Sequence, residues 1–116
     1  MKKMCVIGAG SWGSALALSL HKNNHKVFMW TRDNEQVKEI NDTRKNSKFL
    51  PEIIFPEDLI VSNDLEEVIK DSRIIVIAVP SQAVRSVCKQ IKPFVSSNQI
   101  LVDVAKGLEK GTGLRL

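Results

Sequence analysis

The stretch that decides the fold is Met4 to Leu20, which reads Met-Cys-Val-Ile-Gly-Ala-Gly-Ser-Trp-Gly-Ser-Ala-Leu-Ala-Leu-Ser-Leu. The apolar run that ends at Ile7 predicts a short buried strand, and the small and apolar residues after the glycines predict a closely packed helix. Between them stands Gly8-x-Gly10-x-x-Gly13. In this context the first glycine permits a sharp turn, the second lets a pyrophosphate approach the backbone, and the third lets helix and strand pack closely. The N–H groups at the helix start then favour a phosphate ligand.

Two other interpretations of this stretch are available. A lone glycine motif of this kind often arises by chance. The stretch also resembles a signal peptide, with Lys2 and Lys3 as the basic region and Ala15-Leu16-Ala17 as the cleavage site. Three glycines and a Trp-Gly pair suit an apolar signal region poorly, and a second strand follows at the spacing of a βαβ unit. We therefore favour the strand–turn–helix interpretation.

Composition limits the class of protein. The 116 residues suffice for one domain, and 43% apolar with 26% charged residues is ordinary for a globular protein. The net charge of +4 is mild and includes no run of like charges, so we expect no nucleic-acid partner. No stretch predicts a membrane span. Cys5 falls in a predicted strand and Cys88 on the apolar side of a predicted helix, which indicates two buried thiols in a reducing cytoplasm, with no disulfide and no metal site.

The second predicted strand, 26–30, ends where a dinucleotide-binding unit meets the adenosine ribose. Asn23 and Asn24 supply the helix stop before it. An acidic residue after this strand selects NAD, whereas an arginine accommodates the 2′-phosphate of NADP. The first charged residue is Arg32, which favours NADP unless it is only a solvated arginine; Asp33 follows and either lies in the cofactor site or caps the next helix.

The rest of the chain alternates between helical and strand patterns. The spacing predicts a helix over 35–41, a polar loop over 42–48 that Phe49-Leu50-Pro51 anchors to the core, a strand over 59–61, and a helix over 64–70 capped by Ser62 or Asn63. The six apolar residues within 73–79 predict a central parallel strand buried on both faces.

Two further segments fall at the carboxyl edge of the predicted sheet, where open α/β sheets bind ligands. Val79-Pro80-Ser81 leads from the strand over 73–79 into a helix with an apolar stripe, and it is either part of a site or a plain strand-to-helix turn. Lys106 and Gly107 follow a fifth strand predicted over 100–105. The fold class is therefore α/β, a Rossmann-like doubly wound parallel sheet. It is incomplete, because about five strands are present where two full halves need six.

Five motifs in order carry a resemblance to a known family: residues 8–17, Trp30-x-Arg32, Phe49-Leu50-Pro51, Val79-Pro80-Ser81 and residues 105–109, which read Ala-Lys-Gly-Leu-Glu. The chain resembles the N-terminal, cofactor-binding part of bacterial NAD(P)-dependent glycerol-3-phosphate dehydrogenase. The resemblance covers residues 1–116 and implies a fragment of a longer, cytoplasmic, homodimeric enzyme whose C-terminal helical domain lies outside this chain. It implies reversible hydride transfer between NAD(P)H and dihydroxyacetone phosphate, which gives sn-glycerol 3-phosphate for phospholipid synthesis.

The same resemblance implies roles for individual residues. Besides the three glycines, it assigns Ser11 and Trp12 to the dinucleotide phosphates and Arg32 to the adenosine 2′-phosphate. It places Lys106 against both cofactor and substrate at the reaction centre, and it puts the main catalytic lysine in the absent domain. Asp33 and Phe49 depart from the residues common at their positions, a second basic residue and a tyrosine. We count Asp33, Phe49 and Pro80 among the cofactor-binding residues, with NADPH favoured.

Lys106 also has a role that follows from chemistry, because a positioned ammonium stabilises the negative charge that forms on a ketone oxygen during reduction. A lysine before glycine is otherwise an ordinary exposed loop residue. His21 and His25 lie away from the carboxyl edge and are expected to be surface residues. An alternative function is a nucleotide-sensing regulatory module without catalysis, which only the fold supports. A methyltransferase-type site is disfavoured, because Trp30-Thr31-Arg32 supplies no acidic residue for a ribose diol.

Overall fold

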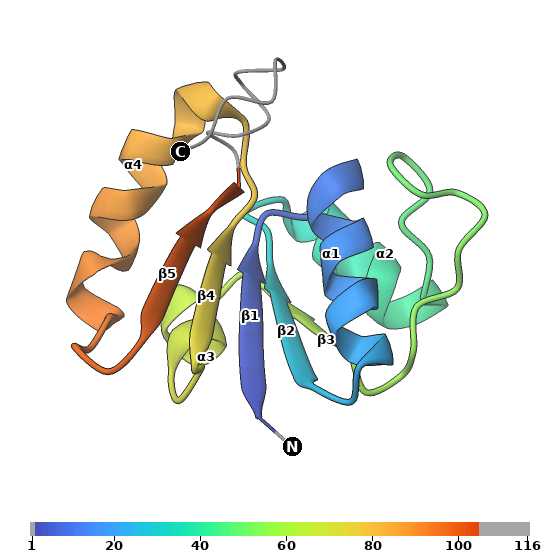
Figure 1. Ribbon diagram of the computed structural model, residues 1–116. Helices are drawn as coiled ribbons and strands as arrows, with labels where there is room; N and C mark the ends of the chain where they lie inside the picture. The colour runs from blue at the N-terminus through green and yellow to red at the C-terminus, as the bar shows by residue number, and fades with distance from the viewer. Residues whose placement is uncertain (1, 105–116) are drawn as a thin grey trace, which may run out of the picture.

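Five parallel strands in the order β3-β2-β1-β4-β5 form the centre of the computed structural model, which describes residues 2–104 (Figure 1). This order confirms the predicted doubly wound class, because the chain runs outward from β1 in both directions. The strands are β1 (Lys3–Ile7), β2 (Lys26–Trp30), β3 (Ile60–Ser62), β4 (Ile74–Ile77) and β5 (Ile100–Asp103). The helices are α1 (Ser11–Lys22), α2 (Asn34–Thr43), α3 (Leu65–Ile69) and α4 (Ser81–Ile91), followed by a 3-10 turn η1 (Lys92–Phe94).

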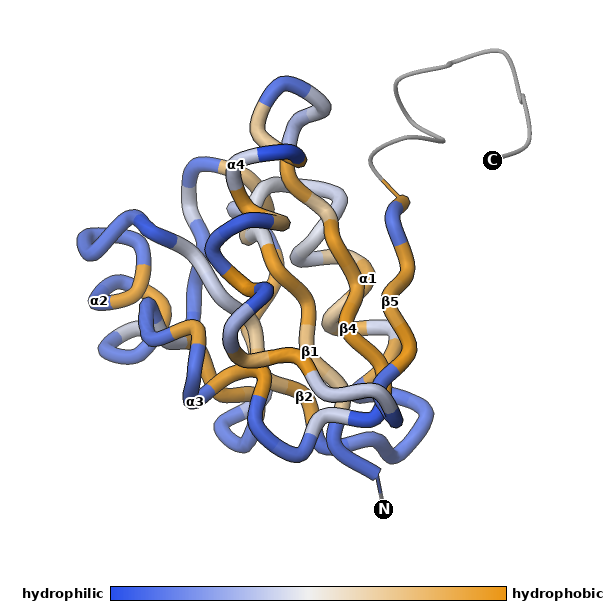
Figure 2. The backbone as a smooth tube through the Cα atoms, turned by 90° about the vertical axis from the view of Figure 1, so that its left-hand side faces the viewer, coloured by the Kyte–Doolittle hydropathy of each residue, from blue (hydrophilic) through white to orange (hydrophobic). Residues whose placement is uncertain are grey.

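The alternation of side chains along each strand divides the core into two layers. Val6, Met29 and Val76 face the side covered by α1 and α2, together with Ala17 and Ile40 from those helices. The neighbouring strand positions face the opposite side, where α3 and α4 pack; they include Cys5, Ile7, Trp30, Ile75 and Ile77. Figure 2 shows the strands as the most hydrophobic part of the chain. Burial on both faces explains why the predicted central strand lacks polar alternation.

The helix ends follow local side-chain chemistry. α1 ends at Asn23, and Asn24 has φ 70°, which confirms the predicted asparagine stop. The Asp33 carboxylate accepts hydrogen bonds from the N–H groups of Glu35 and Gln36, so its capping alternative is confirmed. The predicted cap of α3 was wrong: Asp64 is the cap, while the Ser62 hydroxyl accepts a hydrogen bond from the Asp64 N–H.

The predicted element bounds needed small corrections. α2 runs to Thr43, so the loop begins two residues later than expected, at Arg44 in the left-handed conformation. β3 lies one residue later than predicted, and β4 is shorter because its parallel pairing extends only from Ile74 to Ile77. β5 stops at Asp103, and Ala105, the last residue of the predicted strand, lies outside the described residues.

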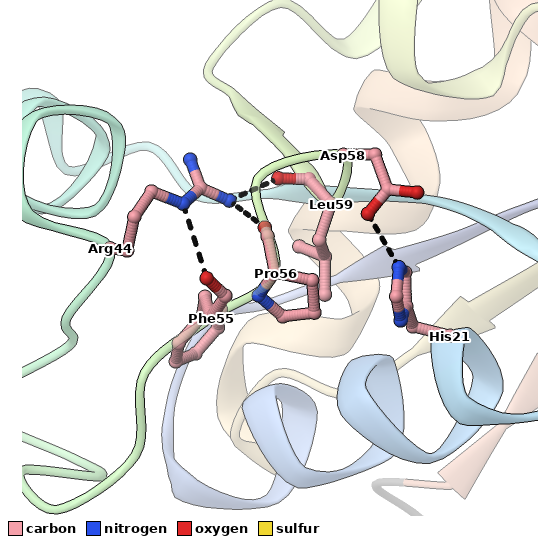
Figure 3. A network of polar contacts seen from close by, with 6 residues as sticks. All are labelled: His21, Arg44, Phe55, Pro56, Asp58 and Leu59. Carbon is pink, nitrogen blue, oxygen red and sulfur yellow. Dashed lines mark hydrogen bonds and ion pairs between the residues drawn. The ribbon is translucent and has the colours of Figure 1, made fainter.

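The loop over 44–59 is fixed more deeply than the predicted Phe49-Leu50-Pro51 anchor suggests. Leu50 does pack against the core, but the fully buried anchors are Phe55, which the prediction missed, and Leu59, which it placed in the strand over 59–61. The Arg44 guanidinium donates to the carbonyl oxygens of Phe55, Pro56 and Leu59, the last at 2.7 Å (Figure 3). Arg44 therefore ties the end of α2 to the far end of the loop.

Both histidines are partly buried rather than fully exposed. His21 Nε2 lies 2.6 Å from Asp58 Oδ1, which joins the last turn of α1 to the same loop (Figure 3). This hydrogen bond holds the pKa of the exposed Asp58 carboxyl below its usual value.

Candidate functional site

The glycine turn occupies the carboxyl edge of the sheet, between β1 and α1 (Figure 1). Gly8 has φ +125°, and a Cβ at this position would lie 2.5 Å from the Ala78 carbonyl oxygen. A Cβ at Gly13 would lie 2.2 Å from the Gly8 carbonyl oxygen. The sharp turn and the close helix–strand approach predicted for these two glycines are thus both present, and neither position has room for a larger side chain.

Gly10 is different from its two neighbours in the motif. Its backbone is extended, with φ −75° and ψ −168°, so its conformation does not require glycine. Within residues 2–104, the nearest atom to a Cβ built there is Phe49 Cε1, at 4.0 Å. The space beside Gly10 is therefore open, which leaves its backbone accessible to a ligand.

The first turn of α1 provides donors for an anion. Gly10 is the N-cap residue and supplies no side-chain hydrogen bond, and the first turn carries no acidic residue. The N–H groups and the positive end of the helix dipole thus face the open side of the turn without a competing carboxylate from α1. Ser11 and Trp12 lie in this turn, and Trp12 is 46% exposed.

Phe49 comes from the loop but lies beside the glycine turn. The Ser11 hydroxyl donates to the Phe49 carbonyl oxygen at 3.1 Å, and the Phe49 ring lies opposite Gly10. The structure therefore brings Phe49 beside Gly10 and Ser11, from which it is far apart in sequence. A hollow of about 300 Å³ adjoins them, between α2 and the loop, and its lining includes Asp33, Gln36, Asn46, Lys48 and Phe49.

Arg32 and Asp33 follow β2 at the same edge but differ in their surroundings. Arg32 is exposed, and among residues 2–104 its side chain forms no hydrogen bond or ion pair. Asp33 uses its carboxylate to cap α2. The cap holds the Asp33 oxygens on the helix N–H groups, whereas the Arg32 guanidinium extends from the surface.

The remaining predicted site residues are placed as follows. Pro80 is exposed, is the N-cap residue of α4 and follows the end of β4 by three residues, so it lies at the carboxyl edge as expected. Lys106 lies outside the described residues.

Buried polar side chains behind the turn were missed by the sequence reasoning. Asn46 and Ser14 are fully buried, and Gln36 is partly buried beside them. Asn46 belongs to a stretch predicted only as a polar loop, and nothing in its local sequence indicated burial.

The two cysteines are free and differ in burial. Cys5 is fully buried, and desolvation raises the pKa of its thiol to about 11. Cys88 is only partly buried, which corrects the prediction of two buried thiols. Among residues 2–104, no group of His, Cys, Asp and Glu side chains is arranged to hold a metal ion. Helices long and apolar enough to cross a bilayer are also absent from this part of the chain.

Comparisons with known proteins identify the family. The family model described as NAD-dependent glycerol-3-phosphate dehydrogenase N-terminus matches residues 3–116. The chain belongs to this family. A relative from Fusobacterium nucleatum, named glycerol-3-phosphate dehydrogenase [NAD(P)+], is 47% identical over 112 residues, which are 97% of this chain and 33% of the relative. A relative of the same name from Listeria monocytogenes is 45% identical over 99% of this chain and 34% of its own length.

Solved structures agree with the family assignment. The glycerol-3-phosphate dehydrogenase of Coxiella burnetii superposes with a TM-score of 0.84 at 33% identity, over 88% of this chain and 31% of that one. The Saccharomyces cerevisiae enzyme gives a TM-score of 0.80 at 31% identity, over 88% of this chain and 33% of that one. This chain therefore spans about a third of the length of the relatives it matches.

Proposed function

We propose that residues 1–116 form the NAD(P)-binding domain of a longer glycerol-3-phosphate dehydrogenase. The observation that carries the proposal is the family match over residues 3–116, together with the open backbone at Gly10. The longer enzyme transfers a hydride reversibly between NAD(P)H and dihydroxyacetone phosphate and so forms sn-glycerol 3-phosphate, which feeds phospholipid synthesis in the cytoplasm. It acts as a homodimer in this proposal.

The residues of the glycine turn fit a dinucleotide. The missing side chain at Gly10 leaves space for a pyrophosphate, and the uncapped first turn of α1 offers N–H donors from Ser11 and Trp12. Gly8 and Gly13 contribute to binding indirectly, because they give the turn its shape. Phe49 and Pro80 border the same edge and complete the cofactor-binding set with Asp33, whose carboxylate fixes the start of α2.

Cofactor preference rests on Arg32 in this proposal. The exposed guanidinium at the end of β2 is suited to the 2′-phosphate of NADPH. Asp33 does not reverse this preference, because its carboxylate already accepts two backbone hydrogen bonds.

The chemical step requires a group that stabilises charge on the substrate oxygen. A bound nicotinamide supplies or accepts the hydride. Lys106 contacts both cofactor and substrate in this proposal, and its ammonium stabilises the negative charge that develops on the ketone oxygen. The main proton-transferring lysine belongs to the part of the enzyme outside this chain, so the 116-residue chain alone is expected to bind cofactor without turnover.

A calorimetric titration of the chain with NADPH and with NADH tests the proposal. We expect both to bind and NADPH to bind more tightly. Arg32→Ala should weaken NADPH binding by about 1.5–3 kcal/mol more than NADH binding, the range for a hydrogen bond to a charged group. Arg73→Ala is the matched control. It removes an exposed arginine directly before β4, at the amino ends of the strands, and should change the affinity for neither cofactor. Equal losses for both cofactors in Arg32→Ala would remove Arg32 from the 2′-phosphate role.

A further inference from the structure

The carbonyl oxygen of Ala9, in the middle of the glycine turn, accepts hydrogen bonds from three different segments. The amide nitrogen of Gln36 on α2 donates at 2.6 Å, that of Asn46 in the loop at 2.9 Å, and the Ser14 hydroxyl on α1 at 3.3 Å. A carbonyl has two lone pairs, so this oxygen is fully occupied. Such a concentration of donors on one backbone atom fixes the orientation of its peptide.

The donors themselves form a closed network. Asn46 uses its second amide hydrogen on the Ser14 hydroxyl at 2.9 Å, and Gln36 uses its second on the Asn46 side-chain oxygen at 3.2 Å. The Thr31 hydroxyl donates to the Gln36 side-chain oxygen at 2.8 Å. Within the described part of the chain, no buried side-chain nitrogen or oxygen lacks a partner. Because each member is held by the others, the network is rigid and resists rotation of the Ala9 carbonyl.

The orientation of this carbonyl determines what the turn presents to a ligand. A trans peptide is planar, so its C=O and N–H bonds point in opposite directions. The Ala9 carbonyl points inward, toward α2 and the loop, and the N–H of Gly10 in the same peptide therefore points away from them. The side chain absent at Gly10 leaves this N–H accessible.

We infer that Asn46 and Gln36 are positioning residues of the dinucleotide site: they hold the Ala9 carbonyl inward and so aim the Gly10 N–H at the pyrophosphate. The inference rests on the proposed function and extends it to two residues whose side-chain amide hydrogens are all used within the protein. It also gives the loop over 44–59 a role, since Arg44 and Phe55 hold in place the segment from which Asn46 reaches the turn.

Titration of the 116-residue chain and its variants with NADPH and NADH tests the inference. Gln36→Met and Asn46→Leu remove the donors while keeping similar volume. Each variant should weaken the binding of both cofactors by the same factor, roughly fivefold to tenfold, which corresponds to the net contribution of one hydrogen bond. The equality is expected because both cofactors carry the pyrophosphate, and it separates this effect from that of Arg32.

A matched control distinguishes positioning from general destabilisation. Gln99 also donates its side-chain amide to two backbone carbonyls, those of Ile69 and Ser72 at 2.9 and 2.8 Å. It lies directly before β5, at the amino ends of the strands and away from the glycine turn. Gln99→Met should lower the unfolding temperature without changing either Kd. In the ligand-free chain, the NMR signal of the Gly10 amide should shift in Gln36→Met and Asn46→Leu and stay in place in Gln99→Met.

The outcomes are distinguishable. Unchanged cofactor affinity in a folded Gln36→Met chain, with wild-type binding intact, would overturn the inference alone. If Asn46→Leu does not fold, Gln36→Met decides the question, because its side chain is only partly buried. Failure of the folded wild-type chain to bind either cofactor would overturn the proposed function and the inference with it.

Discussion

The two edge strands of the sheet differ in how they are covered. β3 is flanked by α2 and the loop over 44–59, and its central residue Val61 is buried together with Phe55 and Leu59. On β5, by contrast, Ile100, Leu101 and Val102 are 53%, 48% and 36% exposed. Figure 2 shows most of β5 as hydrophobic, at the edge of the sheet. The β3 side therefore has fully buried residues, although Ile54 and Ile60 there are 62% and 36% exposed, whereas β5 has no buried residue.

This difference has an energetic meaning. Burial of apolar surface contributes about 25 cal/mol per Å². On the β3 side Phe55, Leu59 and Val61 make that contribution, and it holds the loop that borders the candidate site. The register of β5 with β4 places Ile100 and Val102 on the α1 face and Leu101 on the α4 face, so both faces of the strand are open. We expect the stability of the chain to depend mainly on the covered side.

The largest expected effect comes from Gly13 on the covered side. Gly13→Ala puts a methyl group 2.2 Å from the backbone oxygen of Gly8, which cannot move without breaking the turn. We expect the free energy of unfolding to fall by about 3 kcal/mol, at the upper end for overpacking. Urea unfolding measures this loss. Gly10→Ala is the matched control, and because the space there is open it should cost less than about 1 kcal/mol.

Arg44 should have the next largest effect. Arg44→Met removes the guanidinium that bonds three loop carbonyls and should lower the free energy of unfolding by about 1.5–3 kcal/mol, again measured in urea. Arg85→Met is the matched control: it makes the same substitution at an exposed position of α4, on the β5 side. It should change the free energy of unfolding by less than about 0.5 kcal/mol. Similar losses in the two variants would contradict the claim that the loop carries more of the stability.

A smaller effect is expected in the reactivity of the two thiols, which also differs between the centre of the sheet and its β5 side. Cys5 is fully buried at the centre of the sheet, whereas Cys88 borders a hollow beside Leu101 on the β5 side. A disulfide reagent at about pH 8 should therefore react quickly with Cys88 and with Cys5 only after unfolding. Cys88→Ser should abolish the fast reaction. Fast modification of Cys5 in the native chain would show that the centre of the sheet opens easily.

Cys5 also predicts a dependence of stability on pH. Its pKa is about 11 in the folded chain against 9.0 for an exposed thiol, because desolvation disfavours the thiolate. Below pH 9 the thiol is protonated in both the folded and the unfolded chain, and its contribution to the free energy of unfolding is fully present. Between pH 9 and 11 the unfolded chain loses the proton first, so stability falls as pH rises. Cys5→Ala should flatten this part of the profile.

Sequence reasoning succeeded where the signal was local and periodic. The glycine motif, the asparagine stop of α1 and the apolar run of β4 each predicted their element, because neighbouring residues alone determine a tight turn, a helix end and a strand buried on both faces. The two carboxyl-edge segments that the structure describes, the glycine turn and Pro80, were also placed correctly from the order of strands.

It failed where distant segments meet. The burial of Asn46 depends on Gln36 and Ser14, and the burial of Phe55 depends on α2 and β3, none of which the local pattern reveals. The shift from Ser62 or Asn63 to Asp64 as the cap of α3 is a smaller error of the same kind. β3 pairs with β2 through Ser62, which moves the start of the helix along the chain.

The measurement that tests the central claim most directly is a calorimetric titration of wild-type chain and Gly10→Ala with NADPH. The account predicts that wild type binds and that Gly10→Ala, although folded, binds more weakly by about 1–3 kcal/mol, because its methyl group occupies the open space beside the turn. Equal binding by both chains would place the dinucleotide elsewhere. Absence of binding by the folded wild-type chain would contradict the claim that residues 1–116 hold the cofactor on their own.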